Sequence, residues 1–301
     1  HRAITNYGMI VEEGPHHQRG DDSDLIGLLR WVKLAKALDI TSKKSKQLQQ
    51  QGQTVQSSKN GGNTNDPVNK NCTEILGVGS LLRNSINETP SHVEVKAINW
   101  KGAAATSCVM SPIRFQVYNS ELRSRALLLC DWIPDIDNIS QTIPIIDYLE
   151  KEGNYMRAAA IAVFNMRLQR AIDSLKIGAI KNDPNLSSVA MALSGYTGER
   201  TSMWREMCQS LKSQLTNPYM KAMFAFLTSD ADTSFHEIIY DKDLILADRV
   251  AFSLLYLPDD RLNDYLSGTM STLVENGDLN GILLTGITND GLSLLQRYIE
   301  I

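Results

Sequence analysis

The fold is decided by residues 152–165, which read EGNYMRAAAIAVFN. Gly153 can adopt the left-handed backbone conformation that ends one helix, and Asn154 can cap the next. The small and apolar run from Ala158 to Phe164 then predicts a helix that a neighbouring helix can approach closely. This seven-residue run is the longest unbroken apolar stretch in the chain, and a membrane-spanning helix needs about 20 such residues, so none is expected.

Helical periodicity and stop signals of the same kind continue from residue 120 to residue 301. The pattern Gly277-Asp278-Leu279 repeats that of Gly153-Asn154-Tyr155. Helices are predicted at 120–130, 141–152, 155–164, 166–177, 185–193, 202–215, 217–227, 246–257, 259–276, 278–284 and 290–299. Short loops place consecutive helices side by side and antiparallel. We therefore predict an all-α fold, an α-solenoid of stacked antiparallel helix hairpins over residues 120–301.

The N-terminal third divides into three segments of different character. Residues 1–40 contain the first amphipathic helical pattern, and residues 41–71 form a polar insertion in which 26 of 31 residues are Ser, Gln, Asn, Lys, Gly or Thr. Such a composition buries too little apolar surface to offset its ordering entropy, so we predict disorder there. Residues 72–119 are irregular, and alternating apolar residues at 93–98 and 113–118 predict two short strands and a β-hairpin.

Composition and motifs give little indication of catalysis or nucleic-acid binding. The chain of 301 residues has 30 Lys and Arg against 34 Asp and Glu, a net charge of −4, so no broad basic face for nucleic acid is expected. None of the common phosphate-binding, metalloprotease or hydrolase motifs is present. Cys208 and His236 are a conceivable nucleophile and base, but Cys208 lies among apolar residues typical of a packed core. We predict no catalytic, cofactor-binding or metal-binding residues and no enzymatic activity.

Seven colinear segments of the helical region resemble the solenoid of the Mio (missing oocyte, MIOS) family. They are residues 152–165, 170–172, 189–197, 202–208, 223–229, 248–252 and 281–286. Arg2 to Ile4 and Tyr7-Gly8 resemble the family's helix that follows its propeller, whereas the polar insertion departs from the family pattern. The resemblance is dense over residues 120–301.

The resemblance implies an assembly role that composition does not show. Members of this family are subunits of the GATOR2 complex, called the Seh-associated (SEA) complex in fungi, which relays amino-acid sufficiency to target-of-rapamycin complex 1. It implies Seh-type and Sec-thirteen-type propellers and other WD40 subunits as partners, and a cytosolic protein recruited to the lysosomal or vacuolar surface. A propeller before this segment and a zinc-binding module after it are also implied, with no cofactor in the segment itself. The alternative is a general interaction module of a coatomer-like or nuclear-pore-like scaffold.

The predicted strands are the candidate partner-binding site. Relatives donate a blade to a partner propeller near their solenoids, so the resemblance implies partner contacts by strand addition. The candidate residues are Val93, Val95, Ile98, Ile113, Phe115 and Val117. The alternative is a local hairpin that packs on the chain's own solenoid, and the sequence leaves both open.

Overall fold

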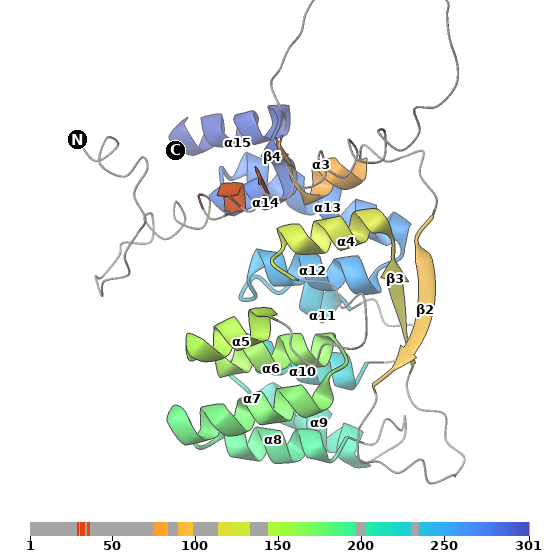
Figure 1. Ribbon diagram of the computed structural model, residues 1–301, viewed down its shortest axis with the longest axis vertical. Helices are drawn as coiled ribbons and strands as arrows, with labels where there is room; N and C mark the ends of the chain where they lie inside the picture. Colours follow the sequence, from red (N-terminus) through yellow and green to blue (C-terminus); the bar gives the residue numbers. More distant parts are fainter. Residues whose placement is uncertain are drawn as a thin grey trace, which may run out of the picture.

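A computed structural model describes residues 75–83, 90–98, 114–132, 144–196, 203–229 and 235–300, together with Leu29, residues 31–33 and residues 35–36. Helices make up most of this part of the chain, and its strands form two short antiparallel pairs (Figure 1). The predicted α-solenoid is therefore confirmed. The insertion at 41–71 and most of the predicted helical region at 1–40 lie outside the described residues.

The helices form two arms, and the second folds back along the first (Figure 1). The first arm runs through α4 (Glu121–Leu129), α5 (Pro144–Lys151), α6 (Tyr155–Phe164), α7 (Leu168–Lys181) and α8 (Leu186–Ser194). The second returns through α9 (Met203–Gln214), α10 (Pro218–Leu227), α11 (His236–Ile239), α12 (Leu246–Tyr256) and α13 (Asp259–Glu275). Consecutive helices pack on one another from α5 to α8 and from α9 to α13, and the return also packs α10 on α6 and α12 on α4.

The helix starts follow from their capping residues. The Asn154 side chain accepts a hydrogen bond from the Arg157 backbone N–H at 3.4 Å, directly after Gly153 with φ of 78°. In α10, the Asn217 side chain accepts hydrogen bonds from the second and third residues of the helix at 3.0 and 3.2 Å, and Pro218 occupies the first helical position. These contacts satisfy N–H groups that have no partner inside the helix.

A buried carboxylate joins the two arms. Asp248 of α12 is almost fully buried and accepts hydrogen bonds from Arg157 Nε at 2.7 Å and Nη2 at 3.1 Å. It also accepts from Trp132 Nε1 at 3.0 Å and from the Tyr219 hydroxyl at 2.7 Å. Arg157 belongs to α6 and Tyr219 to α10, so one side chain connects the first arm with two helices of the second.

Two segments that are far apart in the sequence meet in an upper tier (Figure 1). The helix α3 (Val78–Arg83) packs on α13 and α14 (Ile282–Thr285), which follows the short helix η1 (Leu279–Gly281). The strand β1 (Ile75–Leu76) pairs antiparallel with β4 (Gly286–Ile287), and α15 (Asn289–Glu300) follows. The backbones approach so closely that a Cβ on Gly286 would lie 2.2 Å from the Gly77 nitrogen, and Gly286 has φ of 70°.

We expect Asp248→Ala to lower the free energy of unfolding by about 3–5 kcal/mol, because it leaves the buried Arg157 guanidinium without its counter-charge. Asp248→Asn should cost less, since it keeps the shape and part of the hydrogen bonding. The exposed Asp264 on α13 provides the control, and Asp264→Asn should change stability by less than about 0.5 kcal/mol. Urea unfolding of the three variants measures these values, and an equal loss for Asp248→Ala and Asp264→Asn would contradict the assigned role.

A second prediction concerns the upper tier. Gly286→Ala should destabilise the chain by about 2 kcal/mol or more, because it combines a positive φ with a backbone clash. The matched control is Gly268→Ala in α13, where a Cβ would meet nothing within 4 Å. This change should stabilise the helix by about 0.5–1 kcal/mol. Thermal unfolding measures the change in Tm of each variant, which should be negative for Gly286→Ala and positive for Gly268→Ala. The prediction fails if the two variants shift Tm in the same direction.

Candidate partner-binding surface

The predicted strands form a hairpin whose two strands are apolar on opposite faces. The strand β2 (His92–Ala97) pairs antiparallel with β3 (Arg114–Asn119), and each differs from its predicted range by one residue. In this register Val93 lies opposite Tyr118, and Lys96 lies opposite Phe115. Because neighbouring side chains in a strand point to opposite faces, the β2 valines lie on one face and Phe115 and Val117 on the other.

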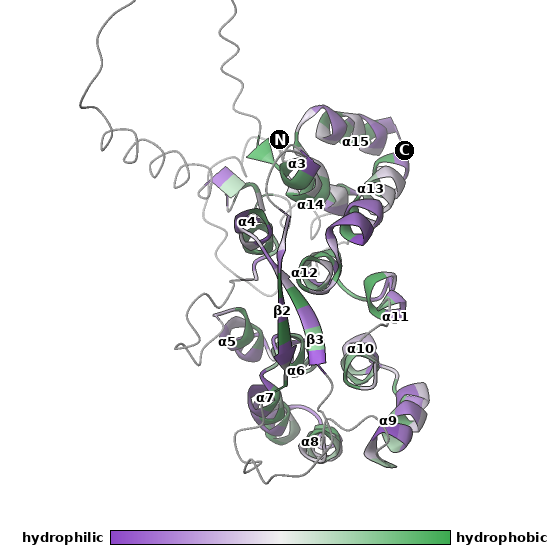
Figure 2. Cartoon of the chain, turned by 90° about the vertical axis from the view of Figure 1, so that its right-hand side faces the viewer, coloured by the Kyte–Doolittle hydropathy of each residue, from purple (hydrophilic) through white to green (hydrophobic). Residues whose placement is uncertain are grey.

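The inner face of the hairpin packs on the chain's own solenoid. Phe115 is 1% exposed and stacks on Phe226 of α10, with ring centroids 4.4 Å apart. Its ring also meets Tyr256 of α12 edge-on at 6.4 Å. Figure 2 shows the hairpin lying over the seam between the two arms. The strand β3 is therefore part of the core, as the local-hairpin alternative requires.

The β2 half of the outer face is apolar and open, whereas Arg114 and Gln116 of β3 on the same face are polar. Val93 is 42% exposed and Val95 is 60% exposed. Among the described residues β2 pairs with β3 alone, so its other edge offers unpaired backbone N–H and C=O groups. An open edge with exposed β-branched side chains is a place where a strand of another protein could add.

The six candidate partner-binding residues thus fall into different environments. Val93 and Val95 are accessible to a partner on the outer face. Phe115 is buried, Val117 is half-buried on the inner face, and Ile98 is half-buried against the core. Ile113 lies outside the described residues. Of the five described candidates, only the two valines present side chains that a partner could contact without displacing the hairpin from the solenoid.

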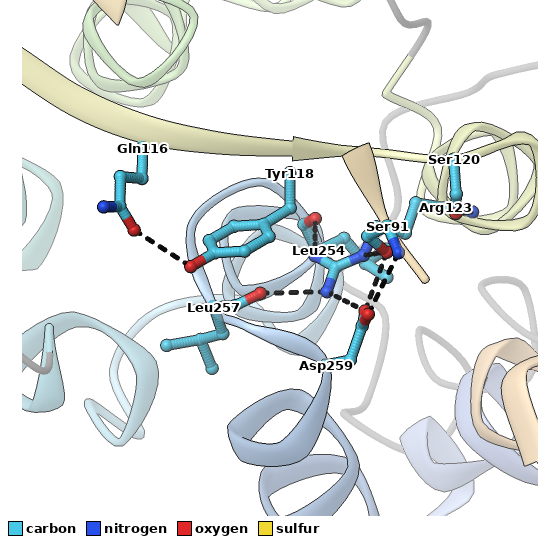
Figure 3. A network of polar contacts seen from close by, with 8 residues as sticks. All are labelled: Ser91, Gln116, Tyr118, Ser120, Arg123, Leu254, Leu257 and Asp259. Atoms are coloured by element: carbon cyan, nitrogen blue, oxygen red, sulfur yellow. Dashed lines mark hydrogen bonds and ion pairs between the residues drawn. The ribbon is translucent and has the colours of Figure 1, made fainter. Parts of the chain in front are cut away.

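A polar cluster, the Ser91 clasp, fixes the open end of the hairpin (Figure 3). The Ser91 hydroxyl and backbone N–H donate hydrogen bonds to the two carboxylate oxygens of Asp259 at 2.7 and 3.1 Å. Arg123 Nη2 donates to the same carboxylate at 2.7 Å, and Arg123 Nε donates to the Ser91 hydroxyl at 2.9 Å. Partial burial alone would raise the pKa of Asp259, but the bonds from Arg123 and Ser91 hold this pKa below its ordinary value.

Arg123 also completes the end of α12. Its guanidinium donates to the backbone carbonyls of Leu254 and Leu257, the latter at 2.9 Å, and these carbonyls lie where the helix ends. The Tyr118 ring lies 5.1 Å from the guanidinium carbon. A cation at a helix C-terminus satisfies carbonyls and opposes the partial negative charge there. The clasp therefore joins the hairpin, α4 and the α12–α13 corner.

The residues considered as a catalytic pair, Cys208 and His236, are not in environments suited to catalysis. Cys208 is buried, and burial raises the pKa of its thiol to about 11, so it is protonated at neutral pH. His236 is exposed and lies against the Tyr240 ring, with centroids 4.4 Å apart. The described ranges hold no group of three or more His, Cys, Asp or Glu residues suited to a metal ion. No helix in the described part of the chain is long and apolar enough to cross a bilayer.

Further exposed apolar side chains lie where the two arms meet at the lower end of the molecule. Met191 on α8 is 67% exposed, and Met203 and Met207 on α9 are 76% and 65% exposed. The sequence did not indicate which helices would carry such residues. It also gave no indication of the Ser91 clasp or of the Asp248 contacts. The one available signal was Arg157, the single charged residue in the otherwise uncharged α6.

Together, the folded-back arms and the hairpin over their seam define an α-solenoid of the kind that serves as a scaffold. A family model described as "MIOS, alpha-solenoid" matches residues 1–256. The chain therefore belongs to the MIOS family.

Three relatives illustrate the match. The chain is 41% identical over 234 residues to "GATOR2 complex protein MIOS-A" of Xenopus laevis, which covers 77% of this chain and 25% of that protein. It is 47% identical over 188 residues to "GATOR2 complex protein MIOS" of Danio rerio, covering 61% and 21%. It is 37% identical over 154 residues to "SEH-associated protein 4" of Saccharomyces cerevisiae, covering 50% and 14%. The matched part of this chain thus spans a quarter or less of each relative.

Proposed function

We propose that this chain is a non-enzymatic scaffold segment of a GATOR2-type, Seh-associated complex. In this role the folded-back solenoid holds other modules at a fixed separation and offers surfaces to partner subunits. The family match and the names of the relatives support this assignment. The same names favour it over a general module of a coatomer-like or nuclear-pore-like scaffold.

The wider role follows from this assignment. The complex would relay amino-acid sufficiency to target-of-rapamycin complex 1, and the cytosolic protein would be recruited to the lysosomal or vacuolar surface. The zinc-binding module of the full-length protein would lie outside these residues, and the segment itself would need no cofactor. Burial of Cys208 as a protonated thiol counts against a nucleophile in this solenoid.

The exposed edge of β2 is the observation that carries the partner proposal. The edge of β2 would pair with the sheet of a Seh-type propeller, which would cover Val93 and Val95 while Phe115 stays in the core. The name of the yeast relative, SEH-associated protein 4, supports a Seh-type partner over a Sec-thirteen-type one. Strand addition uses backbone hydrogen bonds for affinity and side-chain pockets for specificity.

The test is co-elution of the chain with a purified Seh-type propeller in size-exclusion chromatography. We expect the wild-type chain to co-elute and the double variant Val93→Lys, Val95→Lys to lose binding, because it places two charges in a desolvated contact. Lysine is common on edge strands, so the variant should fold normally. Deleting residues 90–119 would be a poorer test, because it would also remove Phe115 from the core.

The matched control is Ile180→Lys on α7, an apolar residue that is 87% exposed and remote from the hairpin along the chain. This variant should co-elute as the wild type does. Loss of binding in both variants would indicate a general effect of added charge. Unchanged binding of the double variant would show that the partner does not bind at β2. Failure of the folded wild-type chain to bind would refute the Seh-type partner.

A further inference from the structure

We infer that the Ser91 clasp is a positioning device for partner binding, which holds the free edge of β2 in the conformation that an added strand requires. This inference rests on the proposed function, because it assigns to Ser91, Arg123 and Asp259 a role in the docking of the same partner. Arg123 lies 5.1 Å from the ring centroid of Tyr118, the residue opposite Val93, and Ser91 directly precedes β2. The clasp therefore acts on the two exposed valines through the hairpin.

The clasp holds the backbone of the hairpin as well as side chains. Ser91 directly precedes β2, and its backbone N–H and hydroxyl engage the two oxygens of one carboxylate. Two contacts from one residue to one rigid group restrict both the position and the direction of the chain entering β2. The first β2 residue, His92, pairs with Asn119, and the next residue, Ser120, caps the N-terminus of α4. The clasp thus fixes the end of the hairpin at which the chain enters β2 and leaves β3.

The supporting groups are themselves rigid. The Arg123 side chain is 2% exposed and is fixed by two α12 carbonyls as well as by Asp259. Asp259 lies in the first turn of α13, where a carboxylate is favoured by the helix dipole. An anchor built on helix ends moves less than one built on a loop, so it can define where β2 lies.

Among the described residues, β2 is held less firmly than β3, although Ile98 directly after it packs against the core. Its outer valines are open, and an isolated two-stranded hairpin is at best marginally stable. Phe115 anchors β3 to the solenoid, whereas β2 is attached through its ladder with β3, through the clasp at one end and through Ile98 after the other end. Without the clasp, a partner would have to order β2 while binding it, and that ordering would weaken the affinity.

The test compares Asp259→Ala with Asp260→Ala in the full chain. Asp260 is exposed on the same first turn of α13, so its removal takes away the same charge from the same helix end. We expect Asp259→Ala to weaken binding of a Seh-type propeller about tenfold and to speed amide hydrogen exchange of residues 92–97 by a similar factor, as expected for loss of charge-assisted hydrogen bonds. Asp260→Ala should change neither quantity.

Ser91→Ala is the second variant, because it removes the hydroxyl and keeps the backbone hydrogen bond to Asp259. Its effect on exchange and on affinity should be smaller than that of Asp259→Ala and in the same direction. Exchange of α6 and α10 amides should stay unchanged in every variant, which separates loss of β2 order from loss of the fold. Calorimetric titration and exchange mass spectrometry supply the two readouts.

The outcomes separate this inference from the proposed function. If the wild-type chain binds the propeller but Asp259→Ala binds equally well, the positioning role is wrong while the proposed function stands. If exchange of residues 92–97 is the same in Asp259→Ala and Asp260→Ala, the clasp does not order β2 and the inference is also wrong. If the wild-type chain does not bind, the proposed function fails, and the inference fails with it because no docking remains for the clasp to support.

Discussion

The carboxylate of Asp248 is the constraint on which the folded-back arrangement depends. A buried carboxylate is costly unless hydrogen-bond donors surround it, and its donors here come from Arg157, Trp132 and Tyr219. These side chains belong to α6, to the segment after α4, and to α10. They converge only when the second arm lies along the first, so any arrangement with separate arms would leave a charge without its partner. The pair thereby favours one register of the arms over others.

A cluster of aromatic rings around Phe226 also joins the two arms, through apolar contacts. Phe226 of α10 lies within ring-contact distance of Phe164 in α6, Phe252 in α12 and Phe115 in β3. The hairpin therefore fills the seam between the arms and at the same time presents its other strand to solvent. The hairpin can contribute Phe115 to the core and still leave Val93 and Val95 exposed, because the two strands carry their apolar residues on opposite faces.

Local features of this fold could be read from the sequence, whereas its long-range contacts could not. Gly153 and Asn154 predict the start of α6, because a helix cap depends only on residues within about four positions of one another. The alternation of apolar residues at Val93 and Val95 likewise predicts a strand, because it is a local pattern. The sequence could not indicate that Asp248 meets Arg157, 91 residues away, or that Asp259 meets Ser91, because such pairs depend on the path of the whole chain. It also could not tell that Phe115 faces inward, since this depends on the helices behind it.

The pairing of β1 with β4 also determines how the molecule would carry a mechanical load. Residues 75 and 76 are hydrogen-bonded to residues 287 and 286, so the chain enters and leaves the two arms at nearly the same point. Tension between the segments before and after this pairing would run through β1, α3 and β4 and bypass the helices from α5 to α11. The hairpin and the aromatic cluster beneath it would then stay undisturbed while the upper tier bears the force.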